Sequence, residues 1–230
     1  GEYDPSGGVG DGGDNWAGGG ILSNYSSYIT LKDVTIRDNT AYAFAGIHFW
    51  VGVNIYLTNV TIRDNIAELA GGAGSISTFS NYYGWDSDEF FTNVFITGNS
   101  ASNDDSHLGG ILFFYCDPIL QNVTISENTA ATRSGGMAIW GSNPILVNTI
   151  IWENSPNVIE ISGSDPTITY SNIQGGWEGE GNIDADPLFS DPDNGDFTLH
   201  EDSPCIDAGT ADIDGDGFED ITDYIGLSPD

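Results

Sequence analysis

The four-residue stretch Ile36-Arg37-Asp38-Asn39 decides the fold of this chain, because four variants of it follow later in the sequence. They are Ile62-Arg63-Asp64-Asn65, Ile96-Thr97-Gly98-Asn99, Ile125-Ser126-Glu127-Asn128 and Ile151-Trp152-Glu153-Asn154. The Asn residues that end successive copies are 26, 34, 29 and 26 positions apart. A repeat of this length that tolerates insertions is typical of stacked coils with loops on one side. We therefore predict a solenoid.

A second motif recurs in phase with the first, and it places a glycine or alanine followed by a glycine before a short apolar stretch. Its copies are Gly19-Gly20-Ile21, Ala45-Gly46-Ile47, Gly71-Gly72-Ala73, Gly109-Gly110-Ile111 and Gly135-Gly136-Met137. Each is followed by a turn and then by an alternating stretch such as Ile119–Ile125. A period of two with β-branched residues predicts strands, and no segment of comparable length has a helical period.

Strands related by this repeat are expected to stack in parallel, with one coil every 4.8 Å or so, which is roughly the spacing of hydrogen-bonded strands. The predicted fold is an all-β, single-stranded parallel β-helix of about six coils. Inward residues then form axial ladders, one of valines beginning at Val34 and one of isoleucines beginning at Ile36. We expect the recurring Asn to form a further ladder at a corner, because Asn tolerates the left-handed region and its amide can bond to the coils above and below. That ladder comprises Asn39, Asn65, Asn99, Asn128 and Asn154.

The repeat divides the 230 residues into three parts. Residues 1–17 form a Gly-rich leader that could pair with a neighbouring chain or be a truncated leader, 18–175 form the β-helix, and 176–230 form an irregular capping tail. With 35 acidic and 4 basic residues the net charge is -31. This charge excludes binding to nucleic acid phosphates and disfavours anionic membranes and glycans unless a divalent cation intervenes. No apolar run is long enough to cross a membrane.

The two motifs together resemble the repeats of polymorphic outer membrane proteins and, more widely, bacterial right-handed parallel β-helix proteins of the pectin-lyase-like kind. The tail extends the resemblance, because it looks like the ending of secreted β-helix repeat proteins. The matching segments are Asn182-Ile183-Asp184-Ala185-Asp186-Pro187-Leu188-Phe189, Asp196-Phe197-Thr198-Leu199 and Ser203-Pro204-Cys205-Ile206-Asp207-Ala208-Gly209. The resemblance implies a right-handed coil in a surface, adhesive or secreted protein.

The end of the tail carries the spacing of a calcium loop. Counted from Asp212, acidic residues stand at positions one, three, five, nine and twelve, and Gly217 stands at the sixth, where the loop must turn sharply. A hard cation that prefers oxygen ligands requires this spacing. The sequence predicts one Ca²⁺ held by Asp212, Asp214, Asp216, Asp220 and Asp223 with the carbonyl of Phe218. The alternative is a flexible acidic tail that is rich in Asp-Gly.

Other candidate groups are weaker. The inserted loop of the third coil carries Phe79, Tyr82, Tyr83 and Trp85, which either form an exposed interaction surface or fold back over their own coil. Asp38 and Asp64 are expected to stack on adjacent coils, as are Glu127 and Glu153, and both pairs are interpreted as splayed into solvent. Cys116 and Cys205 either form a disulfide or are two unpaired thiols.

The sequence shows no constellation typical of an active site. Of the four basic residues, Arg133 alone lies outside the repeat phrases and could serve as the base of a lyase. The three His residues are scattered, and the loop acids form no evident pair. The favoured hypothesis is a non-enzymatic extracellular structural module, either a self-assembling filament subunit or part of a surface adhesin or stalk. The alternative hypothesis is a carbohydrate-binding or lyase-type polysaccharide-degrading protein.

Overall fold

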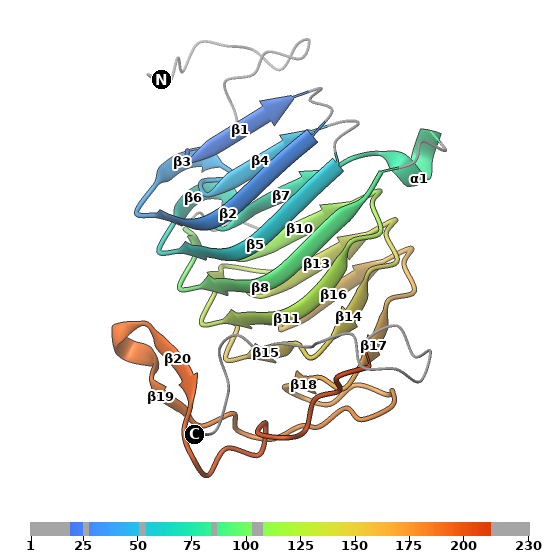
Figure 1. The fold of residues 1–230 in the computed structure, drawn as a ribbon. Helices are drawn as coiled ribbons and strands as arrows, with labels where there is room; N and C mark the ends of the chain where they lie inside the picture. Colours follow the sequence, from blue (N-terminus) through green and yellow to red (C-terminus); the bar gives the residue numbers. More distant parts are fainter. Residues whose placement is uncertain (1–18, 25–27, 51–53, 84–86, 103–107, 213–230) are drawn as a thin grey trace.

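The computed structural model describes residues 19–24, 28–50, 54–83, 87–102 and 108–212, which form stacked coils followed by a tail (Figure 1). Successive coils contribute strands to three parallel sheets, of which the third has only four strands. The prediction of an all-β parallel β-helix is confirmed, and the first sheet has six strands, as the estimate of about six coils requires. The single helical element among the described residues, apart from a 3-10 turn in the tail, is α1 (Ser80–Tyr83).

The three sheets extend along the coil axis, because each is built from the corresponding strands of successive coils. The first contains β1 (Ile21–Asn24), β4 (Ile47–Trp50), β7 (Gly74–Ser77), β10 (Ile111–Phe114), β13 (Met137–Trp140) and β16 (Ile159–Ser162). The second contains β2 (Tyr28–Arg37), β5 (Asn54–Arg63), β8 (Glu89–Thr97), β11 (Ile119–Ser126), β14 (Ile145–Val147), β15 (Ile150–Trp152), β17 (Thr167–Thr169) and β18 (Asn172–Ile173). The third contains β3 (Thr40–Ala43), β6 (Ile66–Ala70), β9 (Ser100–Ala101) and β12 (Thr129–Ala130).

The apolar ladders lie inside the coils in the register that the repeat predicts. Val34, Val60, Val94 and Val123 pair in succession. Ile36, Ile62, Ile96, Ile125 and Ile151 form the second ladder, which Ile173 continues. Their side chains belong to one continuous core, which buries apolar surface on every coil.

The recurring Asn residues form one axial row, which we call the inner Asn ladder. In each of the first four, the backbone N–H and the side-chain amide both donate to Oδ1 of the Asn on the next coil, at 2.8–3.1 Å. The ladder is internal, since Asn65, Asn99 and Asn128 are fully buried. A buried amide is stable only when its polar atoms are paired, and the stacked repeat supplies those partners.

The expectation that these Asn residues occupy the left-handed region is wrong. The left-handed residue is the one immediately before each Asn, namely Asp38, Asp64, Gly98, Glu127 and Glu153. This residue turns the chain at the surface, which directs the following Asn inward to its partners. The Asn is therefore selected for its amide hydrogen bonds rather than for its backbone conformation.

A second rank of short polar residues does occupy the left-handed region. We call it the outer turn rank; it comprises Asp33, Asn59, Asn93, Asn122 and Asn148, all with φ between 53° and 56°. Asn and Asp are the side chains that tolerate this conformation best after Gly. Asn59 donates to Asp33 at 2.9 Å and Asn93 donates to Asn59 at 3.2 Å, so part of this rank is also linked from coil to coil.

The glycine pairs mark places where the coils approach too closely for a side chain. A Cβ on Gly110 would lie 1.9 Å from the carbonyl oxygen of Gly136 on the next coil. Glycine at this position therefore follows from sterics rather than from flexibility.

The tail covers the last coil (Figure 1). Trp177 packs against the core, and the backbone N–H of Ile173 donates to the carbonyl of Ile183 at 3.0 Å. The tail also contains an antiparallel pair, β19 (Phe189–Asp191) and β20 (Asp196–Leu199), joined by the 3-10 turn Pro192–Asn194. Asn148 binds the tail from the side, because its amide accepts from Thr210 N–H and donates to Thr210 C=O, both at 2.8 Å. Part of the last coil's backbone therefore has partners in the tail.

Candidate functional site

The outer surface of the first sheet carries a continuous group of rings. In a strand, alternate side chains point outward, and in β4, β10 and β13 the last outward position holds Trp50, Phe114 and Trp140. With Phe44, His48, Phe79 and Tyr115 they form what we call the outer aromatic face. The rings meet mainly edge to face or stacked, which are the favourable geometries for aromatic pairs.

Phe79 joins the coils on this face. Its ring centroid lies 4.9 Å from Trp50, 5.5 Å from Phe114 and 5.8 Å from Tyr115. This member of the predicted interaction loop therefore folds back over the coils. Tyr82 and Tyr83, on α1, are instead 64 % and 57 % exposed. One part of the loop therefore folds back over the coils, and another part is exposed to solvent. Trp85 lies outside the described residues.

His48 is covered by this face and is held neutral. It stacks on Phe44 with a centroid separation of 4.6 Å and lies against Trp50. Burial lowers the pKa of His48 to about 4, because the charged form would be poorly solvated there. At neutral pH this side chain carries no charge.

A pocket opens where the outer aromatic face meets the turns after β10, β13 and β16. Its volume is about 650 Å³, and its walls include Phe114, Tyr115, Arg133, Trp140, Glu160 and Gly163. We call it the β13 pocket. Gly141, which also lines it, has φ +60° and would place a Cβ only 2.6 Å from the Tyr115 ring. The glycine at this turn therefore leaves space for the Tyr115 side chain.

One ion pair lies in the wall of the β13 pocket. Arg133 Nη1 donates to Glu160 Oε1 at 3.1 Å, and the guanidinium carbon lies 5.7 Å from the centroid of the Trp140 ring. The Trp140 indole N–H has no hydrogen-bond partner among the described residues, and packing and the cation–π contact with Arg133 hold this ring in place. Arg133, the residue that could have served as a lyase base, is thus half of a pair with a carboxylate.

A buried carboxyl group lies behind the inserted loop. Glu89 is 2 % exposed and accepts a hydrogen bond from Ser87 Oγ at 2.6 Å. Burial raises its pKa, although the hydroxyls of Ser87 and Thr78 oppose the shift. Glu89 is not among the residues that line the β13 pocket, so it does not supply a second carboxylate there.

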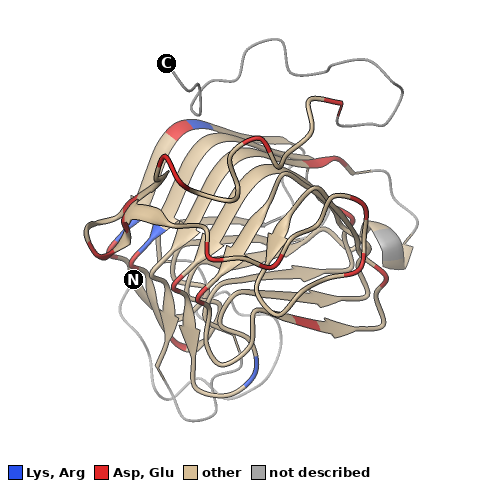
Figure 2. Ribbon diagram, turned by 90° about the horizontal axis from the view of Figure 1, so that it is seen from below, with Lys and Arg blue, Asp and Glu red and all other residues tan. Residues whose placement is uncertain are grey.

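Acidic residues are spread over turns, strands and the tail, and they far outnumber the basic ones, as Figure 2 shows in the view from below. Arg37 and Arg63 pair with their sequence neighbours Asp38 and Asp64. Burial, followed by the charges of Glu153, Asp193 and Asp64, raises the pKa of Glu127. The 176–212 segment has eleven acidic residues and neither Lys nor Arg, so the negative potential is strongest around the covered end.

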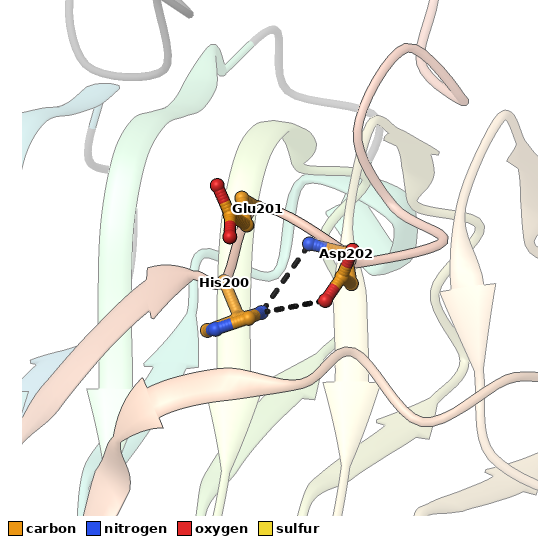
Figure 3. A group of neighbouring side chains, drawn as sticks. All are labelled: His200, Glu201 and Asp202. Carbon is orange, nitrogen blue, oxygen red and sulfur yellow. Dashed lines mark hydrogen bonds and ion pairs between the residues drawn. The ribbon is translucent and has the colours of Figure 1, made fainter.

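His200, Glu201 and Asp202 bring ligand-type atoms within 4.8 Å of one another on the tail surface (Figure 3). All three are exposed, and His200 Nδ1 already accepts from the Asp202 backbone N–H at 3.3 Å. The ring nitrogen nearest the carboxylate is therefore engaged. This arrangement is an exposed turn rather than a preorganised metal centre.

The predicted calcium loop lies almost wholly outside the described residues. Asp214, Asp216, Phe218, Asp220 and Asp223 are among residues 213–230. Asp212 is described, and its backbone N–H and C=O both bond to Thr210 Oγ1. Since Asn148 holds Thr210, the start of the loop is attached to the side of the β-helix.

The two thiols are separate in the structure. Cys116 is buried near the end of β10, and Cys205 is half-buried beside Asn172, which lies 3.0 Å from its sulfur. Burial raises the pKa of both thiols. Of the two alternatives, the structure has the unpaired one.

The sequence interpretation identified the loop aromatics and missed the aromatic residues on the strands. The signal was present, because the apolar stretches after three of the Gly motifs end in Trp50, Phe114 and Trp140. Sequence periodicity alone does not show that the outer side of this sheet is covered by rings.

Comparison with known proteins agrees with the fold. A family profile described as a right-handed β-helix region matches residues 19–179. No match to the chain was found among curated proteins or solved structures. No helix among the described residues is long and apolar enough to span a membrane.

Proposed function

The chain belongs to the right-handed β-helix family, and we propose that it is a non-enzymatic binding module that acts outside the cell or at a cell surface. The observation that carries this proposal is the outer aromatic face. Phe79 of one coil contacts Trp50 and Phe114 of its neighbours, and Phe114 contacts Trp140 of the next. Rings gathered on a rigid sheet with a pocket beside them suit recognition of a partner.

The ionisable side chains near this face are paired, stacked or buried, which favours a binding role over a catalytic one. Arg133 is paired with Glu160, His48 is stacked between rings, and Glu89 is enclosed and bonded to Ser87. A glycosidase requires two carboxyl groups that flank one bond, and a lyase of this fold requires a free base. Neither arrangement is present among the described residues of the β13 pocket.

Enzyme assays test this part of the proposal. Purified protein should release no reducing or unsaturated ends from neutral and acidic polysaccharides, with or without calcium. A turnover that disappears in Arg133→Ala and persists in the control Arg63→Ala would overturn the non-enzymatic assignment.

We also propose that the tail binds one Ca²⁺ through Asp212, Asp214, Asp216, Asp220, Asp223 and the Phe218 carbonyl. The spacing in the sequence supports this, as does the attachment of the first ligand position to Asn148 through Thr210. Calorimetric titration of the chelated protein should show one site, and Asp214→Ala with Asp216→Ala should abolish it. Binding retained in that double variant would remove the site. The calcium-rich surroundings of this loop type are one reason to propose a location outside the cell.

A second candidate function is a filament subunit. β1, β2 and β3 are the outermost strands of their sheets among the described residues, whereas the tail covers the opposite end. Edge strands of this kind pair readily with another chain. A head-to-tail polymer would have to overcome repulsion between chains of charge -31, so its assembly should require calcium.

The leader provides the test. Residues 1–17, which lie outside the described part of the chain, are proposed to pair with a neighbouring subunit. Light scattering with calcium should show self-association of the full chain and monomers after deletion of 1–17. A full chain that stays monomeric at high concentration leaves the adhesin or stalk role.

A further inference from the structure

We propose that residues 14–17 dock on the free edge of β3 in the same chain, with Asn15 as an additional first member of the inner Asn ladder. These residues lie outside the described part of the chain. The inference goes beyond the proposed function and does not depend on it. It follows from the hydrogen-bonding groups at the end of the ladder, from a phrase in the leader and from the path of the chain into β1.

The inner Asn ladder ends at Asn39, where two polar groups await a partner from a preceding coil. Asn39 donates from its backbone and its side-chain amide to Asn65 Oδ1, but its own Oδ1 accepts no hydrogen bond from the described residues. On the next coil, Ile66 N–H donates to the backbone carbonyl of Asn39 at 2.8 Å. Thr40 N–H has the same position on the first coil, and it has no acceptor among the described residues. One further Asn in register would donate to Asn39 Oδ1 and accept from Thr40 N–H.

The leader contains the phrase that this position requires. In four coils the ladder Asn follows an acidic residue or Gly and precedes, by two positions, an Ala: Asp38-Asn39-Thr40-Ala41, Asp64-Asn65-Ile66-Ala67, Gly98-Asn99-Ser100-Ala101 and Glu127-Asn128-Thr129-Ala130. Asp14-Asn15-Trp16-Ala17 repeats this pattern. The Ile that stands three positions before each ladder Asn is replaced by Gly12. The isoleucine ladder therefore does not continue, and the added step belongs to the third sheet alone.

The glycine that leads into β1 indicates where the additional Asn should lie. A Cβ on Gly20 would be 3.1 Å from Asn39 Nδ2, and a Cβ on Gly136 would be 3.1 Å from Asn154 Nδ2. The two glycines thus have the same relation to the ladder. The ladder residue that precedes Gly136 is Asn128, and it donates to Asn154 from its backbone and its amide. The Asn that precedes Gly20 should donate to Asn39 in the same way.

Asn15 is at a suitable distance along the chain to fill this place. It precedes Gly20 by five residues, and in the last coil Asn154 precedes Val158 by only four. Val158 is the counterpart of Gly20 in the register of the first sheet. A connection of this kind that is shorter still therefore already spans the same corner elsewhere in the molecule.

This contact would make the chain its own partner at one edge of the open end. An uncovered strand edge pairs readily with another chain. With residues 14–17 on β3, any pairing with a neighbouring subunit would have to use β1 or β2. The step does not use residues 1–13, so it is compatible with the filament candidate as well as with a monomer.

The experiment measures amide hydrogen exchange at Thr40 by NMR in the full chain without calcium. The altered chains are Asn15→Asp and two truncations, one lacking residues 1–13 and one lacking 1–17. Asn143→Asp is the matched control, because Asn143 is exposed and accepts from Asp165 N–H through Oδ1, an atom that Asp retains. The Thr129 amide, which donates to the Asn99 carbonyl at 2.9 Å, reports in every sample whether the third sheet is intact.

Thr40 should exchange about tenfold more slowly in the full chain than in the chain that lacks residues 1–17, because it gains a hydrogen bond. Removal of residues 1–13 should leave the slow exchange unchanged. Asn15→Asp should accelerate exchange by about tenfold, because a carboxylate cannot donate to Asn39 Oδ1 and is repelled by it. Asn143→Asp should have no effect at Thr40, and Thr129 should stay protected throughout.

Equally fast exchange at Thr40 with and without residues 14–17 would overturn the inference. An equal response to Asn15→Asp and Asn143→Asp would do the same, because the added charge and not the ladder would then be the cause. Slow exchange that disappears when the chain is diluted to a monomer would assign the contact to the leader of a neighbouring chain. The filament candidate expects monomers without calcium, so these results are separate from its fate, which light scattering decides.

Discussion

The inner Asn ladder and the outer turn rank use the same short amide side chain for different physical purposes. The inner residues have ordinary backbone angles, all but Asn39 are buried, and their amides hold successive coils together. The outer residues take the left-handed conformation and lie at or near the surface. The inner rank is therefore specified by hydrogen bonding and the outer rank by backbone geometry, so the two should respond differently to the same substitution.

The largest effect is expected for Asn128→Ala in the inner ladder. Asn128 accepts from the backbone and amide of Asn99 and donates to the carbonyl of Ile96. Its loss leaves several buried polar groups without partners, which should cost about 3–5 kcal/mol of unfolding free energy. Urea denaturation measures this. A loss below about 1 kcal/mol would show that the ladder is not an interior network of this strength.

The second prediction concerns Glu89, a buried carboxyl group. Burial raises the pKa of Glu89, so the folded chain holds this proton more tightly than the unfolded chain. The unfolding free energy should therefore fall as pH rises from the ordinary pKa of glutamate through the raised pKa of Glu89. Glu89→Gln keeps the side-chain volume and should reduce this decline.

The measurement is the unfolding free energy of Glu89→Gln and of the unaltered chain between pH 4 and pH 8. Glu127→Gln serves as a comparison, because Glu127 also has a raised pKa but is less buried. If the unfolding free energies of Glu89→Gln and the unaltered protein depended on pH in the same way, burial of Glu89 would not be the cause of the decline.

Asn148 belongs to the outer turn rank but also holds the tail. Asn148→Ala removes both hydrogen bonds to Thr210, so it should loosen the tail at a cost of about 1–2 kcal/mol beyond the turn itself. Limited proteolysis should cut the tail faster in this variant. Asn122→Ala is the matched control, since Asn122 is also left-handed, with φ 53°, and forms no hydrogen bond with the described part of the tail. Equal cleavage in both variants would argue against the tether.

The smallest effect is expected for Asn122 itself. Ala tolerates the left-handed region poorly, so Asn122→Ala should lose about 1 kcal/mol, whereas Asn122→Gly should lose little or nothing. The contrast between the two variants, measured by urea denaturation, isolates backbone conformation. If Asn122→Gly were as unstable as Asn122→Ala, side-chain contacts would control the outer rank too.

Much of the candidate site could not have been predicted from the sequence. Arg133 stands out in the sequence as a basic residue outside the repeat, but its pairing with Glu160 joins residues on different coils. The partners are 27 positions apart, and the turns between them decide whether the side chains meet. The β13 pocket likewise depends on the small size of Gly141 beside Tyr115, a local property that repeat spacing does not encode.

The coil and its register could be predicted from the repeats alone. The spacing of the Ile-x-x-Asn phrase and the Gly motifs dictated which residues stack, because parallel strands pair at one repeat and alternate residues face inward. Only the tertiary structure decided which Asn rank is left-handed and which loop ring folds back. It also decided which outward rings gather into a face. These outcomes depend on side-chain packing between coils and on corner geometry, where a single dihedral angle reverses the direction of a side chain.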